Sequence, residues 1–276
     1  MEQYCESKIW TYELLDWINE EKLSWCELSR NPNAIQMLEK NPEKIHWSMF
    51  SLNENAINLL EKNQEKIDWV YLSLNPNAME LLEHNPEKID WSMLSMNRNA
   101  IYLLEKNPEK IDWSLLSRNS NAIELLEKNK EKIDWEYLSE NPNGTCLLEK
   151  NPDKIYWILL SENPNAIHLL EKNPEKICWA CLSQNPNGIS LLENNQEKIS
   201  WCCLSVNPNA IHLFKKNPEK IRWRHLSYNP SIFKKTINYK YLYQRMNIIR
   251  EELLMRCMHP SRLERWIEMG GEIDDF

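Results

Sequence analysis

Residues 85–106 read NPEKIDWSMLSMNRNAIYLLEK, and close variants of this 22-residue unit follow one another along most of the chain. Tryptophan marks the register, because it recurs every 22 residues from Trp25 to Trp223 with no insertion between copies. The series contains ten copies. One unit is too short to enclose a core, so each copy must cover its apolar side with the copies before and after it. The repeat therefore predicts a solenoid.

The composition and the local signals favour short helices. The chain has only four glycines and two valines, which is unfavourable for sheets. In residues 163–172, NPNAIHLLEK, Asn163 is a suitable helix cap, Pro164 suits a first helical turn, and the apolar residues after them share one side. A second helix of the unit contains the tryptophan. It begins either at the proline of NPEKI or, after a turn, at positions such as Asp134 and Trp135, because aspartate is also a good cap.

We therefore predict an all-α, elongated α-solenoid of about ten repeats of two short helices, with helical caps at both ends. Residues 1–24 are the expected N-terminal cap, residues 25–231 the repeats and residues 232–276 the C-terminal cap. Within the caps we expect a helical apolar face at residues 10–18 and helices at 232–236, 239–257 and 260–269. A leucine-rich-repeat-like solenoid is the alternative, because 22 residues also suits that unit.

The repeated tryptophans are expected to pack successive copies together, and a cofactor role is the less favoured reading. The structural tryptophans are Trp47, Trp69, Trp91, Trp113, Trp135, Trp157, Trp179 and Trp201. Asparagine recurs in the same way, for example at Asn97, Asn99 and Asn107. Capping of helices and turns is the favoured role for these asparagines, and a ligand-binding ladder of amides is the alternative.

Few residues suggest chemistry, and we expect neither an enzyme nor a bound cofactor. Cys178 and Cys181 have a spacing that suits metal or redox chemistry, and Cys202 and Cys203 lie one repeat later. Buried thiols at ordinary repeat positions are the favoured interpretation, because Cys181 and Cys203 replace apolar residues of other copies. No metal site is predicted. No phosphate-binding glycine loop and no nucleophile motif occurs in the sequence.

Partner-binding residues are expected where the copies differ. The position between the conserved AI and LL pairs varies most, while its neighbours are nearly constant. Its candidate partner-binding residues are Gln36, Asn58, Glu80, Tyr102, Glu124, His168 and His212, and Cys146 and Ser190 complete the series. The position after LS also varies, and its apolar members Leu52, Leu74 and Met96 would form a hydrophobic patch if they were exposed.

Charge is divided unevenly along the chain. Residues 1–214 carry 20 Lys or Arg against 33 Asp or Glu, whereas residues 215–265 carry 13 against 4. The acidic array lacks the continuous basic surface of a solenoid that follows a phosphate backbone. A basic region near the C-terminus remains a candidate for binding RNA, DNA or an acidic partner. The favoured interpretation is a cap whose basic face complements the negative charge of the array or of the acidic tail. The candidate residues of the basic region are Arg222, Arg224, Lys234, Lys235 and Lys240.

The sequence has no run of about 20 apolar residues that would span a membrane, and its start lacks the features of a signal peptide. We therefore expect no membrane partner and an intracellular, cytoplasmic location. Several of the eight cysteines fall at ordinary repeat positions, which agrees with a reducing compartment.

The repeat of residues 20–231 resembles the tandem repeats carried by many proteins of nucleocytoplasmic large DNA viruses of the mimivirus and phycodnavirus type. The closing residues 258–266, MHPSRLERW, followed by GEIDDF at 271–276, are similar to the end of such proteins. The resemblance implies a giant-virus protein that acts in the cytoplasm of an infected cell or is packaged in virions. It brings no catalytic residues to this chain.

These observations predict a non-catalytic scaffold for protein–protein interaction, whose partner is a host or virion protein. The alternatives are a solenoid that binds nucleic acid through the basic C-terminal region, and a structural component of the virion. The oligomeric state is not predicted.

Overall fold

The computed structural model describes residues 9–257 and 259–269, and these group into two compact units. The repeat unit, Leu14–Phe233, carries the ten copies. The terminal unit combines Met1–Glu13 with Lys234–Phe276. None of the helices in the described ranges has both the length and the apolar character that crossing a bilayer requires.

Each copy contains a 3-10 helix of three residues and a first α-helix that begins at the tryptophan, and every copy but the tenth adds a second α-helix. The 3-10 helices that precede the first helices are η1 (Glu20–Lys22), η2 (Pro42–Lys44), η3 (Gln64–Lys66), η4 (Pro86–Lys88), η5 (Pro108–Lys110), η6 (Lys130–Lys132), η7 (Pro152–Lys154), η8 (Pro174–Lys176), η9 (Gln196–Lys198) and η11 (Pro218–Lys220). The first helices are α2 (Trp25–Ser29), α4 (Trp47–Ser51), α6 (Trp69–Leu74), α8 (Trp91–Met96), α10 (Trp113–Arg118), α12 (Trp135–Glu140), α14 (Trp157–Leu160), α16 (Trp179–Gln184), α18 (Trp201–Leu204) and α20 (Trp223–Leu226).

Nine copies also have a second helix. These helices are α3 (Ile35–Glu39), α5 (Ile57–Glu61), α7 (Met79–His84), α9 (Ile101–Lys106), α11 (Ile123–Lys128), α13 (Thr145–Lys150), α15 (Ile167–Lys172), α17 (Ile189–Glu193) and α19 (Ile211–Lys216). In the ninth copy the turn before α19 is a 3-10 helix, η10 (Pro208–Ala210). In the tenth copy the corresponding turn, η12 (Pro230–Ile232), leads into a strand instead of a helix.

The cap residues explain where these helices begin. The first helix begins at the tryptophan because the preceding residue caps it, and Asp112 Oδ1 accepts a hydrogen bond from Leu115 N at 3.1 Å. The second of the two starts considered for this helix is therefore confirmed. The expected start of the second helix at the NPN segment is wrong by three residues. Asn163 caps a turn there, with its Oδ1 accepting from Asn165 N at 2.9 Å, and α15 begins only at Ile167.

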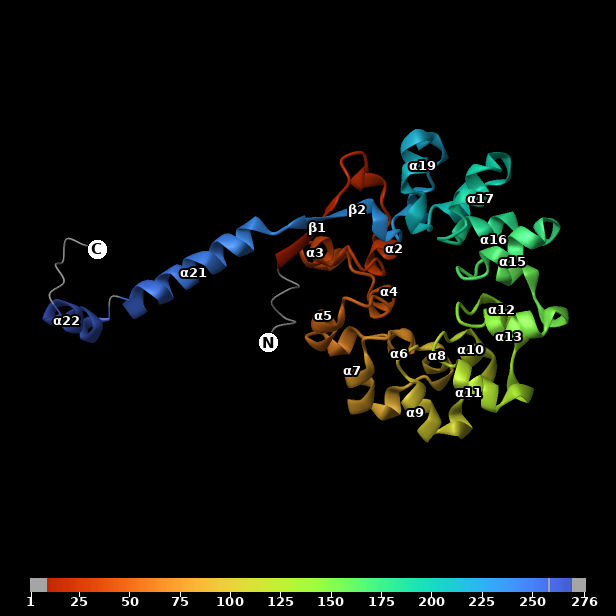
Figure 1. Cartoon of the computed structure of the whole chain (residues 1–276), viewed down its shortest axis with the longest axis horizontal. Helices are drawn as coiled ribbons and strands as arrows, with labels where there is room; N and C mark the ends of the chain where they lie inside the picture. Colours follow the sequence, from red (N-terminus) through yellow and green to blue (C-terminus); the bar gives the residue numbers. More distant parts are fainter. Residues whose placement is uncertain (1–8, 258, 270–276) are drawn as a thin grey trace. The chain divides into compact units, whose positions relative to one another are not determined.

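The prediction of an all-α solenoid is confirmed. Residues 15–232, all of which the structure describes, contain helices and turns and no strand, which excludes the leucine-rich-repeat-like alternative. The first helices of neighbouring copies pack side by side and lie toward the centre of the repeat unit, while the second helices lie at its rim (Figure 1).

The first and the last copies are hydrogen-bonded to each other, so the repeat unit is a closed ring (Figure 1). Asn31 Nδ2 donates to the backbone oxygens of Ser227 at 2.9 Å and Asn229 at 3.0 Å. The same two bonds link each later copy to the copy before it. The junction is thus built like any other contact between copies.

Three further contacts cross the same junction. Ser24 N donates to Ser227 Oγ at 2.8 Å, and Asn33 Nδ2 donates to Pro230 O at 2.9 Å. Leu15 N donates to Ile232 O at 2.9 Å. The expectation of an elongated array is therefore wrong. Each copy is rotated slightly against the preceding one, and ten such steps return the chain to its start, so the terminal copies cover each other.

β1 (Trp10–Leu14) and β2 (Phe233–Ile237) form a two-stranded sheet, and all of their residues except Leu14 and Phe233 belong to the terminal unit. That unit continues with α21 (Tyr239–Cys257) and α22 (Pro260–Glu268). The two C-terminal helices were predicted within a residue of these bounds. Helices at residues 10–18 and 232–236 are wrong predictions, because both segments carry the aromatic and β-branched residues that favour strands. The expected contributions of Met258 and of residues 270–276 lie outside the described residues.

Candidate interaction surface

The constant positions of the unit form the core and offer little to a partner. In the sixth copy, Leu138 and Leu148 have no solvent exposure, and the corresponding leucines of other copies, or phenylalanines at Phe50 and Phe214, are equally buried. The serine and the first asparagine of each LSxN segment, such as Ser117 and Asn119, are also buried. Every buried side-chain nitrogen and oxygen of the described residues has a hydrogen-bond partner. Polar burial is therefore compensated throughout this core.

The buried asparagines link the copies. Asn119 Nδ2 donates to Ser95 O at 2.9 Å and to Asn97 O at 2.8 Å, both in the preceding copy. Its Oδ1 accepts from Asn121 N at 3.0 Å, which closes its own turn. The predicted capping role is confirmed for this column, and the third column also caps, since Asn129 Nδ2 donates to Leu125 O at 2.8 Å. A ladder of amides exists, but its bonds go to the backbone of the same and the preceding copy, which supports a structural role.

The tryptophans are half-buried rather than enclosed. Each lies where two copies meet, and in nine copies a lysine of the following 3-10 helix covers the ring. Lys132 Nζ, for example, lies 4.3 Å from the centre of the Trp113 ring. At the junction of the ring, Lys22 Nζ lies 5.3 Å from the centre of the Trp223 ring. These contacts support the predicted role of the tryptophans in packing copies together, with a cation–π contribution that the sequence analysis did not foresee.

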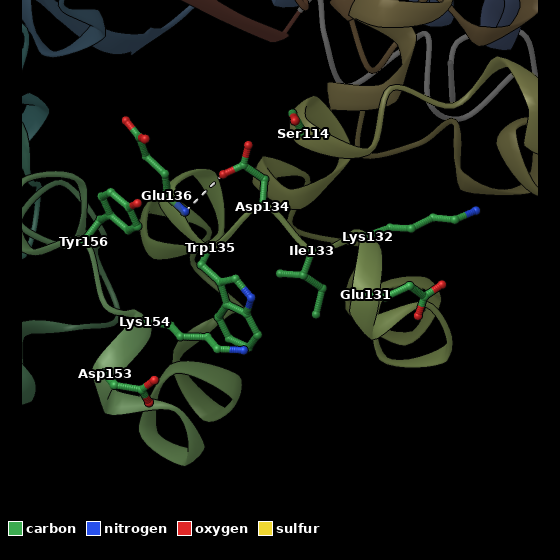
Figure 2. A pocket seen from close by; sticks show the side chains of 10 residues that line it. All are labelled: Ser114, Glu131, Lys132, Ile133, Asp134, Trp135, Glu136, Asp153, Lys154 and Tyr156. Atoms are coloured by element: carbon green, nitrogen blue, oxygen red, sulfur yellow. Dashed lines mark hydrogen bonds between the residues drawn. The ribbon is translucent and has the colours of Figure 1, made fainter.

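An open groove of about 680 Å³ lies beside one of these tryptophans (Figure 2). Figure 2 shows the Lys154 side chain running along the Trp135 ring, and its Nζ lies 4.4 Å from the ring centre. Asp134 Oδ1 accepts from Glu136 N at 3.1 Å, as the dashed line marks. The groove therefore combines an occupied aromatic face with acidic side chains. Two of its lining residues have structural roles, because Asp134 caps a helix and Lys154 contacts the Trp135 ring.

The variable column lies on the second helices, at the rim of the repeat unit (Figure 1). Gln36 is half-buried, and the other members, from Asn58 to His212, are exposed. Two members contact glutamates of the preceding copy, since His168 Nε2 lies 2.8 Å from Glu149 Oε1 and His212 Nε2 lies 3.0 Å from Glu193 Oε1. The predicted partner-binding residues are thus accessible, and they form a series around the ring rather than one compact site.

Most residues of the column after LS are half-buried, and Arg118 is exposed. Leu52, Leu74 and Met96 are half-buried, so the exposure on which a hydrophobic patch there would depend is not found. Elsewhere this column forms polar contacts between adjacent copies. The Arg118 guanidinium pairs with the Glu140 carboxylate, and Gln184 Nε2 donates to Glu162 Oε1 at 3.4 Å.

Two further properties belong to this column. The Arg30 guanidinium lies over the Tyr228 ring at 3.9 Å, which adds another contact at the junction of the ring. Burial raises the pKa of the Glu140 carboxyl above its ordinary value, against the opposing attraction of Arg118. Variation in this column therefore accompanies changes in copy-to-copy packing.

Several residues of the predicted basic region have partners within the chain. In the repeat unit, Arg224 Nε lies 3.4 Å from Glu27 Oε1 across the junction. In the terminal unit, Lys234 Nζ lies 3.9 Å from Glu13 Oε2, and Lys235 Nζ lies 4.4 Å from the centre of the Trp10 ring. Arg222 and Lys240 are exposed. The five residues belong to two units, so they are not assembled into one surface by the described contacts.

Two of the described cysteines lie next to each other, and a third lies near a histidine. Cys178 Sγ lies 3.1 Å from Cys181 Sγ, and Cys202 Sγ lies 3.8 Å from His225 Nδ1. Burial, followed by the hydrogen bond to Cys178, raises the pKa of the Cys181 thiol far above its ordinary value, which favours the neutral thiol. Among the described side chains, no three of His, Cys, Asp or Glu gather as metal ligands would.

One accessible position was not identified from the sequence, the residue directly after the tryptophan. Val70 and Ile158 occupy it in two copies and are 46% and 65% exposed. They lie on first helices, which face the centre of the repeat unit (Figure 1). This position also changes from copy to copy, which was the signal that could have identified it.

Comparison of the chain with protein-family models, with curated proteins and with solved structures finds no match.

Proposed function

We propose that the repeat unit is a non-catalytic scaffold that binds a protein partner through the variable column at its rim. The observation that carries this proposal is the contrast between positions on the same helices. The constant leucines are buried and pack the copies together, whereas Tyr102, Glu124 and His168 occupy one exposed position and differ in size and charge. A fixed backbone that presents a changing side chain is how repeat proteins build specific surfaces.

Nucleic-acid binding is the weaker candidate. Three of the five basic residues considered for it already contact an acidic or aromatic side chain of this chain. Phosphate binding would have to displace these contacts or rely on Arg222 and Lys240. Binding of this kind would weaken steeply with salt.

The giant-virus origin, the cytoplasmic or virion location and the role of a structural virion component remain expectations of the sequence resemblance. A structural role predicts that the protein is recovered from purified particles in stoichiometric amounts. A host-directed scaffold predicts recovery with a cellular protein.

The test compares two sets of variants of the full chain. The first set replaces variable residues by alanine, as Tyr102→Ala, Glu124→Ala and His168→Ala. The matched control replaces the constant, exposed glutamates of the same helices, as Glu105→Ala, Glu127→Ala and Glu171→Ala. Tagged protein is purified from host-type cells with and without nuclease, bound proteins are identified by mass spectrometry, and the affinity of the purified partner is then titrated.

A saturable, nuclease-resistant partner whose affinity falls more than tenfold in the first set and less than about twofold in the control supports the proposal. Equal losses in both sets would contradict recognition through the variable column. Recovery of nucleic acid alone, lost on charge reversal of Arg222 and Lys240, would favour the alternative.

A further inference from the structure

The helix α21 carries a long apolar stripe that is open to solvent. Met246, Ile249 and Leu253 are 69%, 46% and 56% exposed, although they are large apolar side chains. A helix of 19 residues is about 28 Å long, and the stripe runs along most of it. Exposed apolar surfaces of this extent usually mark an interface.

The spacing of the stripe is that of a coiled coil. Tyr239, Leu242, Met246, Ile249 and Leu253 are separated by alternate steps of three and four residues. This is the spacing of the a and d positions of a heptad, which face a partner helix. Met246, Ile249 and Leu253 also line an apolar hollow of about 560 Å³ on the surface of α21. The stripe therefore suits the side chains of another helix with the same spacing.

The flanking charges select both the partner and its direction. Arg245 and Glu252 occupy successive g positions beside the stripe, and Tyr243 and Arg250 occupy successive e positions. In a parallel pair of identical helices, Arg245 would face Arg250 of the second copy. In an antiparallel pair with Met246 opposite Ile249, Arg245 faces Glu252 of the second copy and Arg250 faces its Tyr243.

We propose that α21 pairs antiparallel with α21 of a second copy of this chain, in the register that places Met246 opposite Ile249. Shifting this register by one heptad would place Arg245 opposite Arg245 or Glu252 opposite Glu252. The charge pattern is thus complementary in one orientation and one register only. The inference is independent of the proposed function of the repeat unit.

Sedimentation velocity of the full chain over a range of concentrations tests this pairing. The natural chain is expected to show a concentration-dependent dimer. Met246→Glu places a charge in the stripe and is expected to abolish the dimer. Ile248→Glu is the matched control, because Ile248 is also exposed, at 57%, but lies on the opposite side of α21.

Charge reversal tests the direction. Arg245→Glu and Glu252→Arg each create like-charge pairs and are expected to raise the dimer dissociation constant about fivefold. The double variant restores opposite charges and is expected to return the constant to that of the natural chain. In a parallel dimer, Arg245→Glu would tighten association instead, because it would face Arg250.

The proposal is overturned if the natural chain sediments as a monomer at high micromolar concentration, as it would if α21 packed against its own chain. It is also overturned if Met246→Glu and Ile248→Glu dimerise alike, or if the double charge reversal fails to restore the affinity.

Discussion

Asn119 makes three hydrogen bonds through a side chain that is almost fully buried. Two of them reach the preceding copy and one closes its own turn. Each asparagine of this column therefore serves both the local conformation and the contact between copies. This dual role explains why the residue persists through all ten copies while its neighbours vary.

Replacement of Asn119 by alanine is expected to lower the free energy of unfolding by about 3 kcal/mol, because it removes all three bonds and leaves buried acceptors less well satisfied. Chemical denaturation measures the loss. Asn121→Ala is the control, since Asn121 is exposed, and its side chain donates to Arg98 O at 2.8 Å and accepts a long bond from Ser120 Oγ at 3.5 Å. The control should lose less than about 1 kcal/mol. Equal losses would refute the special role of the buried column.

Glu140 is expected to make stability depend on pH. Because burial raises the pKa of its carboxyl, the folded chain holds this proton more tightly than the unfolded chain. The contribution of Glu140 to stability is therefore greatest at low pH and is lost as the pH rises from about 4, the ordinary range of a glutamate, through the higher folded pKa.

The Glu140→Gln variant cannot lose a proton, so its stability relative to the natural chain should improve as the pH rises from about 4 to about 7. Thermal or chemical denaturation across this interval measures the difference. Glu127→Gln, at an exposed position of α11, is the control. A Glu140→Gln difference that stays constant with pH would show that burial has no net effect on the pKa.

At the scale of the elements, short helices depend on their caps. The first helices have four to six residues, so each one includes little more than a turn. Asp112 caps α10 by accepting from Leu115 N. Asp112→Ala should cost about 1 kcal/mol of stability, and Asp112→Asn, which keeps the acceptor, should cost only a few tenths. Chemical denaturation measures the stability of the two variants. Both variants remove the charge of Asp112, so equal losses of stability would indicate a charge effect and not a cap effect.

The contact between each 3-10 helix and the preceding first helix is also testable. A double-mutant cycle of Trp113→Leu and Lys132→Ala should give a coupling free energy of about 0.5 kcal/mol, the value for an exposed cation–π pair. The same cycle with Lys128→Ala, an exposed lysine of α11, is the control. A coupling that is zero for both lysines would show that the ring contact contributes nothing.

The elements inside the repeats could be predicted because the tryptophan and the asparagine after LS recur ten times at a fixed period, and the prolines and capping residues of many copies agree with that period. The predicted starts of the second helices were too early in the sequence, because an asparagine suits a turn as well as a helix cap. Residues 10–14 and 233–237 occur once each. Their identity as strands depends on their pairing, since β1 and β2 are 219 or more residues apart in the sequence and no local signal records that contact.

At the scale of the whole molecule, the closure of the ring was not predicted. It depends on a small rotation at each of ten contacts, and local sequence patterns do not specify that rotation. One signal was present in the sequence. Leu28 in the first copy and Leu226 in the last keep the constant apolar residue instead of a polar replacement. Two open ends without caps would have left these leucines exposed.

The site was predictable only in part for a related reason. The sequence identified which positions vary, and the exposure of His168 and Tyr102 agrees with that choice. The sequence could not distinguish variable positions that are exposed to solvent from variable positions that lie at the contacts between adjacent copies. Leu74 and Glu140 belong to the second kind, because helix geometry and ring closure turn that column toward the neighbouring copy.

Closure of the ring is tested most directly by a distance between its first and last copies. Spin labels at Cys26 and at Arg224→Cys, in a chain whose other cysteines are replaced, occupy the position after the tryptophan in copies one and ten. Labels at Ser92→Cys and Ser114→Cys occupy the same position in two adjacent copies. A closed ring predicts the same distance distribution for both pairs. An open solenoid would separate the first pair by nine layers of about 8–10 Å each, and that result would contradict the closed ring.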